Sequence, residues 1–391
     1  MMNKITGVAP LWRNSRFRGW LFQIMTLAIV GALFWTLFDN LQVNLANRGI
    51  STGFGFLDSE AGFGIISHLI DYSESSSYGQ AFLVGLLNTL LVSFIGIILA
   101  TLLGILVGVA RLSSNWLISR LALGYVELIR NIPLLLQIFF WYFAVLRSLP
   151  SPRQSINWGD AIFMNNRGIY LPSPLPGEGF SLAGWVFGFA LVASLLLFRW
   201  ARRRQHRTGK LFPYWSVSMG LLIGLPLLTQ ALQGFPLSWE LPVLRGFNFR
   251  GGIVMIPEFL ALLLALSIYT ASYIAEIVRA GIQAVNRGQS EAALSLGLTR
   301  GQTLRLVVLP QALRVIIPPL TSQYLNLLKN SSLAAAIAYP DLVSVFAGTV
   351  LNQTGQAVEV IGITMGVYLL ISLSISMLMN WYNHKMRLVE R

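Results

Sequence analysis

Long apolar stretches alternate with polar segments along the chain. Each stretch is close to, or longer than, the roughly 20 residues with which an α-helix crosses the ~30 Å hydrocarbon core of a bilayer. The pattern therefore predicts eight membrane-spanning helices. They are expected over residues 20–38, 80–110, 121–146, 182–198, 214–233, 257–279, 315–338 and 357–381.

The composition indicates the same class of protein. Of the 391 residues, 55% are apolar and only 11% are charged, whereas soluble domains usually carry about 25% charged residues. A soluble fold of this length cannot hide so much apolar surface, because much of any folded surface still faces the solvent. The soluble classes are therefore excluded, and an all-α polytopic membrane protein is predicted.

The net charge of +13 is unevenly distributed along the chain. If both termini lie in the cytoplasm, 20 of the 28 Lys and Arg residues fall in cytoplasmic segments and 6 in external ones. This asymmetry is the one that sets membrane orientation. The basic run 199–207 fits only a cytoplasmic turn between two spans. Topology therefore explains the positive charge, with attraction to anionic membrane lipid as a minor addition, and nucleic-acid binding is not required.

The first apolar stretch has two interpretations. Four basic residues precede it, as in a secretory signal peptide; they are Lys4, Arg13, Arg16 and Arg18. The stretch is longer than the apolar part of a usual signal peptide, and no good small-x-small cleavage site follows it. We therefore expect an uncleaved span, with a signal peptide as the alternative.

The sequence offers little for catalysis or metal binding. There are no cysteines, which excludes disulfides, iron–sulfur clusters and thiolate zinc sites, and the three histidines lie far apart. The only Gly-Lys pair, Gly209-Lys210, lacks the upstream glycine and the following Ser or Thr of a P-loop. We therefore predict no catalytic site, no metal site and no cofactor bound by this chain.

The longest cytoplasmic connection, 280–314, predicts two short helices. The first begins near Ser290, and Gly297 supplies its left-handed C-cap. Thr299 with Gln302 forms a capping box for the second helix, which is expected to end near Leu309 with a bend at Pro310. Such an elbow either offers a docking surface to a cytoplasmic partner or lies on lipid headgroups as an interfacial linker. The residues alone leave both interpretations open.

Two acid–base pairs lie inside predicted spans, toward their cytoplasmic ends. In Glu127–Arg130 and in Glu276–Arg279 the two residues are three positions apart and share one helix face. An ionisable residue at membrane depth is a functional candidate. We expect these pairs to brace or gate the bundle, with direct substrate contact as the alternative.

Small residues and a proline predict local packing features. Gly96, Gly104 and Gly108 form a ridge of small residues on the second span, which suits close helix packing. Pro133 is expected to kink the third span, because proline removes a backbone hydrogen bond inside a helix.

The segment around Glu291 resembles the coupling loop of ABC importer permeases. The shared pattern is Glu291-Ala292-Ala293, then Gly297 four residues after the second alanine, and then Leu309-Pro310. Three further pieces resemble the polar amino-acid branch of that family; they are residues 127–137, 273–282 and 329–333. The extra length resembles the permease subunits of general L-amino-acid or glutamate/aspartate-type uptake systems.

This resemblance implies a five-helix permease core with three extra spans. The first part of the core is expected at 80–146 and the second part at 257–391, with the coupling loop at 280–314. Residues 1–79 hold a cytoplasmic segment, one extra span and an external loop. Residues 147–256 form an insertion with external loops and two extra spans.

The resemblance also implies partners and a mechanism. A cytoplasmic ATPase dimer is expected to hydrolyse ATP-Mg and to bind the coupling loop through Glu291, Ala292, Ala293, Gly297, Leu309 and Pro310. An external, periplasmic solute-binding protein delivers L-amino acids, and the spans alternate between inward- and outward-facing states. A second permease is needed, and the extra length favours a paralogue and thus a heterodimer. The location implied is the bacterial inner membrane, with both termini in the cytoplasm.

Polar side chains near the middle of the spans are candidates for the translocation path. Amides and hydroxyls can bind both ends of an amino-acid zwitterion, although such groups often bond to a backbone or a neighbouring helix instead. The candidates are Gln137, Tyr269, Thr270, Ser272, Tyr273, Asn326 and Lys329.

The main alternative is an autonomous ion- or proton-coupled secondary transporter. Such a carrier needs an ion site deep in the bundle, whereas the two acids inside spans, Glu127 and Glu276, both lie near one end. A carrier also has no use for a docking elbow. A membrane enzyme is a third class, for which the sequence lacks a credible nucleophile or metal site.

Overall fold

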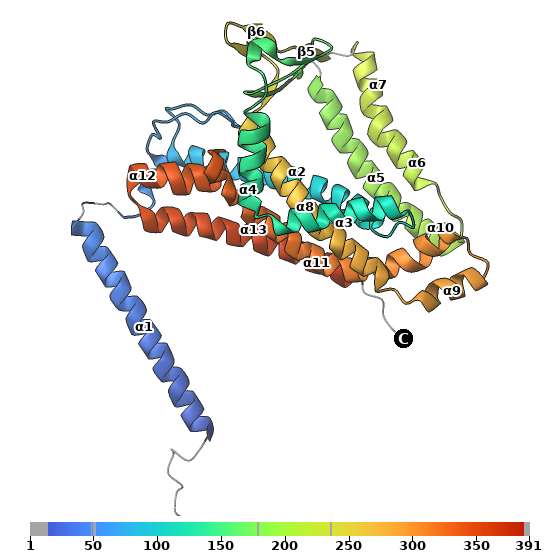
Figure 1. The fold of residues 1–391 in the computed structure, drawn as a ribbon, viewed down its shortest axis with the longest axis horizontal. Coiled ribbons are helices and arrows are strands. Elements are labelled where there is room, and N and C mark those ends of the chain that lie inside the picture. The colour runs from blue at the N-terminus through green and yellow to red at the C-terminus, as the bar shows by residue number, and fades with distance from the viewer. Residues whose placement is uncertain (1–14, 48, 50–51, 178–179, 235–236, 387–391) are drawn as a thin grey trace, which may run out of the picture. The chain divides into compact units, whose positions relative to one another are not determined.

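The computed structural model describes residues 15–47, 49, 52–177, 180–234 and 237–386, and the described part is mainly helical (Figure 1). Within it, seven helical segments are long and apolar enough to cross a membrane, and one bent helix pair is an eighth candidate. These segments match the predicted spans in order, and most are longer than predicted. They are α1 (Ser15–Asn47), α2 (Tyr78–Ala110), α5 (Phe180–Thr208), α6 to α7 (Tyr214–Leu232), α8 (Pro257–Gln283), α10 to α11 (Arg300–Asn330) and α13 (Ala357–Met386). The predicted cytoplasmic ends at 1–14 and 387–391 lie outside the described residues.

The third predicted span is a broken helix rather than a kinked one. Helix α3 (Trp116–Asn131) and the segment made of α4 (Leu134–Phe139) and the π-helical turn η3 (Phe140–Leu146) are bent by 105°. Pro133 explains the break, because it has no backbone N–H and forces the residue before it into an extended conformation. Gln137 Nε2 donates to the carbonyl oxygens of Ile129 and Ile132, at 2.9 Å each, and so satisfies acceptors left open at the break.

The parts of the insertion that were predicted to be external loops form short strands. Strands β1 (Ile156–Trp158), β2 (Ile162–Asn165), β3 (Gly168–Leu171) and β8 (Ile253–Met255) form one antiparallel sheet in that order. Strand β4 (Ser173–Pro176) pairs with β5 (Leu237–Glu240), and β6 (Val243–Arg245) pairs with β7 (Asn248–Arg250). These strands are three or four residues long, which is too short for an alternating pattern to predict them. The segments that flank α5 to α7 therefore pair with each other into one β subdomain, residues 152–176 and 237–255.

The chain divides into two compact units. One comprises residues 92–339, and α8 forms its centre, with two thirds (67%) of its most apolar 18-residue window buried. Gly104 and Gly108 let α2 approach α8 closely, because a Cβ at Gly104 would lie 2.6 Å from Ile274 Cβ and one at Gly108 would lie 2.8 Å from the Ala275 carbonyl oxygen. The predicted ridge of small residues is thus confirmed at these two positions.

The other unit comprises residues 1–91 and 340–391. Its core joins the loop after α1, the start of α2, the π-helical segment η8 (Val343–Val350), α12 (Leu351–Thr354) and α13. Phe56 stacks on Phe346 with ring centroids 6.2 Å apart. Asn88 Nδ2 donates to the carbonyl oxygens of Ser67 and Pro340, so a polar side chain fixes the connection before η8.

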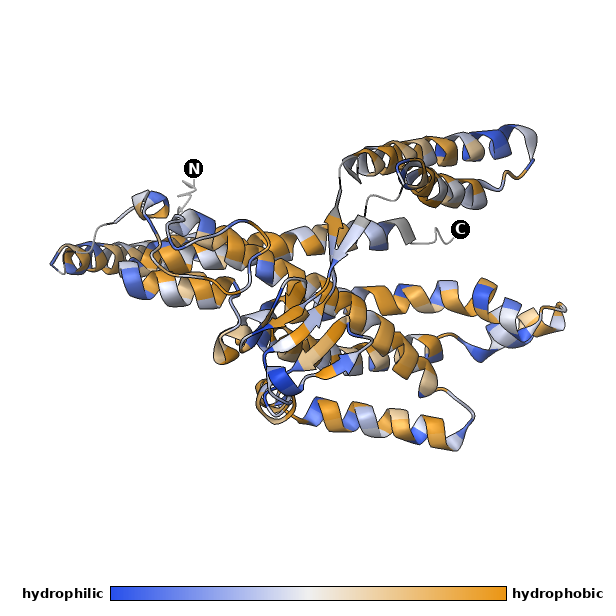
Figure 2. Ribbon diagram, turned by 90° about the horizontal axis from the view of Figure 1, so that it is seen from above, coloured by the Kyte–Doolittle hydropathy of each residue, from blue (hydrophilic) through white to orange (hydrophobic). Residues whose placement is uncertain are grey.

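Helices α5, α6 and α7 form a hairpin whose main contacts are internal. Figure 2 shows hydrophobic residues along this pair and hydrophilic residues at one end of it, where the last turns of α5 carry the basic run 199–207. Arg204 lies over the rings of Trp200 and Phe212, at 5.4 and 5.8 Å from their centroids. The apolar sides of the hairpin remain exposed within the described chain.

Candidate coupling and translocation sites

The predicted elbow begins with helix α9 (Arg287–Ser295). Asn286 caps this helix by accepting a hydrogen bond from the Gly288 N–H at 2.8 Å, so the helix starts three residues before the predicted Ser290. Gly297 adopts a left-handed conformation with φ of +84°. This conformation lets the Leu298 N–H donate back to the Ala293 carbonyl oxygen at 3.2 Å. The predicted glycine C-cap is therefore confirmed.

The second part of the elbow continues into a span without a bend at Pro310. The predicted capping box of Thr299 and Gln302 is present at the start of α10 (Arg300–Thr303). The chain then passes through the π-helical turn η6 (Leu304–Val308) into α11 (Leu309–Asn330). Pro310 lies in the first turn of α11, where its missing N–H is tolerated. The predicted helix end near Leu309 is therefore wrong.

The exposed face of α9 combines one acid with apolar residues. Glu291 and Ala292 are exposed, whereas Ala293 is buried on the side where α9 packs against η6. Leu294 is 45% exposed and Leu296 is 84% exposed. The family motif does not include these two leucines. Their place in a connection predicted to lie in the cytoplasm is the sequence signal that would have identified them. Such an apolar surface suits a protein partner.

A network of three charged side chains lies near the C-terminal end of α8. Glu276 forms ion pairs with Arg279 and with Arg111, which follows the last residue of α2. Arg279 Nε lies 3.1 Å from Glu276 Oε1, and the same guanidinium also donates to Gln283 Oε1. The predicted pair of Glu276 and Arg279 is therefore present. Arg111 was not predicted, because only the folded chain brings the two helices together.

The other predicted pair, Glu127 with Arg130, is not formed. The guanidinium of Arg130 lies over the ring of Tyr273, 4.9 Å from its centroid. The hydroxyls of Tyr273 and Tyr269 are 3.0 Å apart. Tyr125 on α3 donates to the Ile268 carbonyl oxygen at 2.7 Å, which holds α3 against α8 at this level. One arginine and two tyrosines therefore gather beside the break between α3 and α4.

Of the remaining candidates for the path, Ser272 contacts this cluster, within the described residues, only through the backbone of Tyr269. The side-chain nitrogen of Gln137 bonds to the backbone at the break, and Ser272 Oγ donates to the Tyr269 carbonyl oxygen at 2.6 Å. Thr270 is buried. Asn326 and Lys329 are exposed on α11. Of the seven predicted residues, the structure brings Tyr269 and Tyr273 together.

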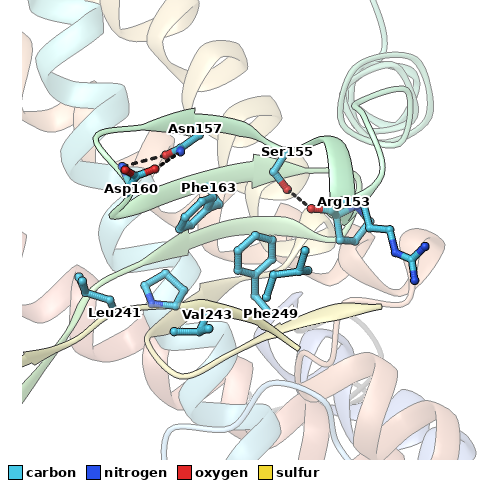
Figure 3. Close-up of a pocket in the computed structure, with 11 residues that line it drawn as sticks. Arg153, Ser155, Asn157, Asp160, Phe163, Leu241, Val243 and Phe249 are labelled. Atoms are coloured by element: carbon cyan, nitrogen blue, oxygen red, sulfur yellow. Dashed lines mark hydrogen bonds between the residues drawn. The ribbon is translucent and has the colours of Figure 1, made fainter. Parts of the chain in front are cut away.

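A pocket of about 390 Å³ opens in the β subdomain. Figure 3 shows Phe163 and Phe249 in its floor, Asp160 and Asn157 at one side and Arg153 at the other. The centroids of the two phenylalanine rings lie 4.5 Å apart. The Arg153 guanidinium lies over the Phe247 ring at 4.6 Å. The pocket thus joins an apolar floor to a basic edge.

Comparisons with known proteins find similar chains in one family. A family model described as the binding-protein-dependent transport system inner membrane component matches residues 216–388. The chain is 60% identical over 379 residues to the amino-acid ABC transporter permease protein YhdX of Escherichia coli (strain K12), which covers 97% of this chain and 96% of that protein. It is 52% identical over 378 residues to the general L-amino acid transport system permease protein AapQ of Rhizobium johnstonii, covering 97% and 94%. A solved structure of an amino acid ABC transporter with histidines is 23% identical, with a TM-score of 0.47 over 79% of this chain and 95% of that chain.

Proposed function

Because this chain belongs to the family of amino-acid ABC transporter permeases, we propose that it is the subunit through which an ATP-driven importer carries L-amino acids across the bacterial inner membrane. The observation that carries this proposal is the 60% identity over 97% of the chain, which extends beyond the five-helix core into the extra spans. The autonomous carrier is not favoured. Both termini lie in the cytoplasm in this arrangement.

ATP hydrolysis takes place on a separate cytoplasmic ATPase dimer, which binds ATP-Mg while this chain binds none. The surface of α9 supports this division, because Glu291, Leu294 and Leu296 are exposed on a cytoplasmic elbow. Gly297 turns the chain there. Since the elbow is continuous with α11 through η6, a movement imposed on α9 is transmitted directly to a span. The two ATPase subunits would drive alternating access by pulling such elbows together.

The coupling role is tested by replacing Glu291 with arginine. The tagged chain is extracted in mild detergent, and the proteins that co-purify are identified by mass spectrometry. We expect a P-loop ATPase with the natural chain, and its loss with Glu291→Arg. Gln205→Arg is the matched control, because it also adds a positive charge to an exposed cytoplasmic helix.

The same experiment tests the function itself. If the natural chain purifies alone and moves amino acids into liposomes without ATP, the importer proposal is wrong. A second permease in the sample supports the paralogous heterodimer, whereas this chain as the only permease supports a homodimer.

The external solute-binding protein is proposed to bind the β subdomain. This subdomain adjoins the first residue of α8, whereas the elbow follows its last, so the two lie at opposite ends of a span about 40 Å long (Figure 1). Exposed apolar residues surround the pocket, and they are Trp158, Leu241, Val243, Leu244 and Phe247. Arg153, Arg245 and Arg250 are exposed beside them, so the surface suits an acidic partner with an apolar centre.

This docking surface is tested with reconstituted protein. Val243→Asp should weaken the stimulation of ATP hydrolysis by the binding protein while hydrolysis without the binding protein stays unchanged. Gln233→Asp, at the exposed end of α7 and outside the lining of the pocket, is the matched control for added charge. If the binding protein stimulates ATP hydrolysis equally in Val243→Asp and in the natural chain, it docks on another surface.

A further inference from the structure

Arg130 occupies an unusual position for a charged side chain. It is the second-last residue of α3, directly before the break at Pro133. Tyr273, which it covers, lies 16 residues from the start of α8 and 10 from its end, or about 24 Å and 15 Å along the axis. The guanidinium is therefore well inside the membrane-spanning layer.

The guanidinium has no anionic partner in the described part of the chain. Among the described residues the guanidinium contacts the face of the Tyr273 ring, and the side chain of Arg130 is otherwise exposed. A charge at this depth is costly against lipid, and such residues face a water-filled cavity or the interior of a bundle. The exposed side of Arg130 must therefore face an aqueous path or the second permease.

The nearby charge network provides a direct contrast. One turn further along α8, the guanidinium groups of Arg111 and Arg279 both pair with the single carboxylate of Glu276. Each of these two cations therefore has an acidic partner within the chain. Arg130 is the cation at this depth whose N–H donors have no acceptor among the described residues.

The two tyrosines add to the donors. Their hydroxyls lie 3.0 Å apart, so one proton is used in the bond between them and the other remains available. A guanidinium with five N–H groups and one further hydroxyl proton forms a site for a planar anion, which a carboxylate matches in shape and charge. The break in the helix supports this assignment, because transporter sites form where membrane helices are interrupted.

We infer that Arg130, with Tyr273 and Tyr269, receives the α-carboxylate of the amino acid during translocation. This inference rests on the proposed function. The α-carboxylate is common to all L-amino acids, so a site that binds it is indifferent to the side chain. Arg130 is thus a determinant of substrate class, and the selection among amino acids belongs to other groups.

The inference is tested by uptake into proteoliposomes that hold the whole complex with ATPase and binding protein. Glutamate and leucine serve as substrates, and KM and kcat are measured for each. Arg130→Gln should lower kcat/KM about tenfold or more for both substrates, because a charge-assisted bond is lost. Arg130→Lys, which keeps the charge, should recover part of this loss. Tyr273→Phe, which keeps the stacked ring, should lower kcat/KM several-fold.

Two controls separate this site from folding and from coupling. Arg120→Gln removes a charge from the same helix ten residues earlier and should leave uptake unchanged. All variants should still co-purify with the ATPase partner, and Arg120→Gln should retain the basal rate of ATP hydrolysis. If Arg130→Gln takes up both substrates as the natural chain does, the inference is wrong. It is also wrong if kcat/KM falls for glutamate alone, because the side-chain carboxylate would then be the ligand. A natural chain that binds no ATPase contradicts the proposed function instead.

Discussion

Helix α8 and the α5 to α7 hairpin are both apolar, yet they pack in opposite ways. Two thirds (67%) of the most apolar window of α8 is buried inside the chain, compared with 11% for α5 and none for α6 to α7. Their mean hydropathies over that window are 1.8, 2.1 and 1.4, so apolarity does not distinguish them. In a membrane the lipid is as apolar as a protein core, and shape rather than hydrophobicity decides which helices associate.

Glycine positions show how shape makes this difference. A Cβ at Gly104 would clash with Ile274 on α8, so glycine is required for the close approach of α2. Gly184 and Gly188 in the hairpin have no neighbouring atom within 4 Å of such a Cβ. The same residue type therefore fixes helix packing in one region and has no partner in the other.

The largest expected effect is that of Gly104→Leu. The new side chain would displace α2 from α8, and overpacking of this kind costs about 3 kcal/mol or more. We expect loss of the folded chain from detergent extracts, measured by size-exclusion chromatography and thermal unfolding. Gly188→Leu is the matched control and should behave as the natural chain.

If Gly104→Leu and Gly188→Leu both behave like the natural chain, then α2 and α8 do not need to approach closely, and glycine does not distinguish the two regions. A severe effect of Gly188→Leu would show that the second permease packs on the hairpin. The size of that effect therefore measures how much of the exposed hairpin surface is covered in the complex.

Buried and exposed charges give a second contrast. The arginines in the last turns of α5 lie at the surface, whereas Asp341, in the connection between the spans 300–337 and 357–384, has no exposed surface. Burial raises the pKa of Asp341 to about 7, although the N–H of Ser344 donates to its Oδ1 at 2.8 Å and opposes this rise. Asp341 therefore binds a proton in the folded chain at a pH where the unfolded chain has lost it.

This difference predicts a pH dependence of stability. Between the unfolded pKa of about 4 and the folded value near 7, the folded state holds more protons, so stability falls as the pH rises. The expected loss is on the order of 2 kcal/mol between pH 5 and pH 7, and it should level off above the folded pKa. Asp341→Asn should flatten this profile in thermal unfolding of the purified chain. If the stability of Asp341→Asn depends on pH as that of the natural chain does, another group is responsible for the pH dependence.

The sequence predicted the spans, the elbow with its caps and the glycine ridge, because each depends on local pattern or spacing. It did not predict contacts that join distant segments. The pairing of β4 with β5 links residues more than sixty positions apart, and Arg111 reaches Glu276 only after α2 packs on α8. Arg130 was assigned to Glu127 because the two share a helix face, whereas the packing of α3 on α8 brings it to Tyr273.

The smallest effect is expected from removal of the hairpin itself. In β4 and β5, Pro176 pairs with Leu237, so residues 177–236 can be replaced by an Asn-Gly turn that joins the two strands. Two spans are lost together, and the orientation of α8 and of the elbow is preserved. We expect the shortened chain to bind the ATPase as the natural chain does and to unfold within about 0.5 kcal/mol of it, since the main contacts of the hairpin are internal. Deletion of α5 alone is the control, because an odd number of spans would place the elbow outside and abolish ATPase binding. If the two-span deletion also abolishes binding, the hairpin supports the core through contacts made only in the assembled importer.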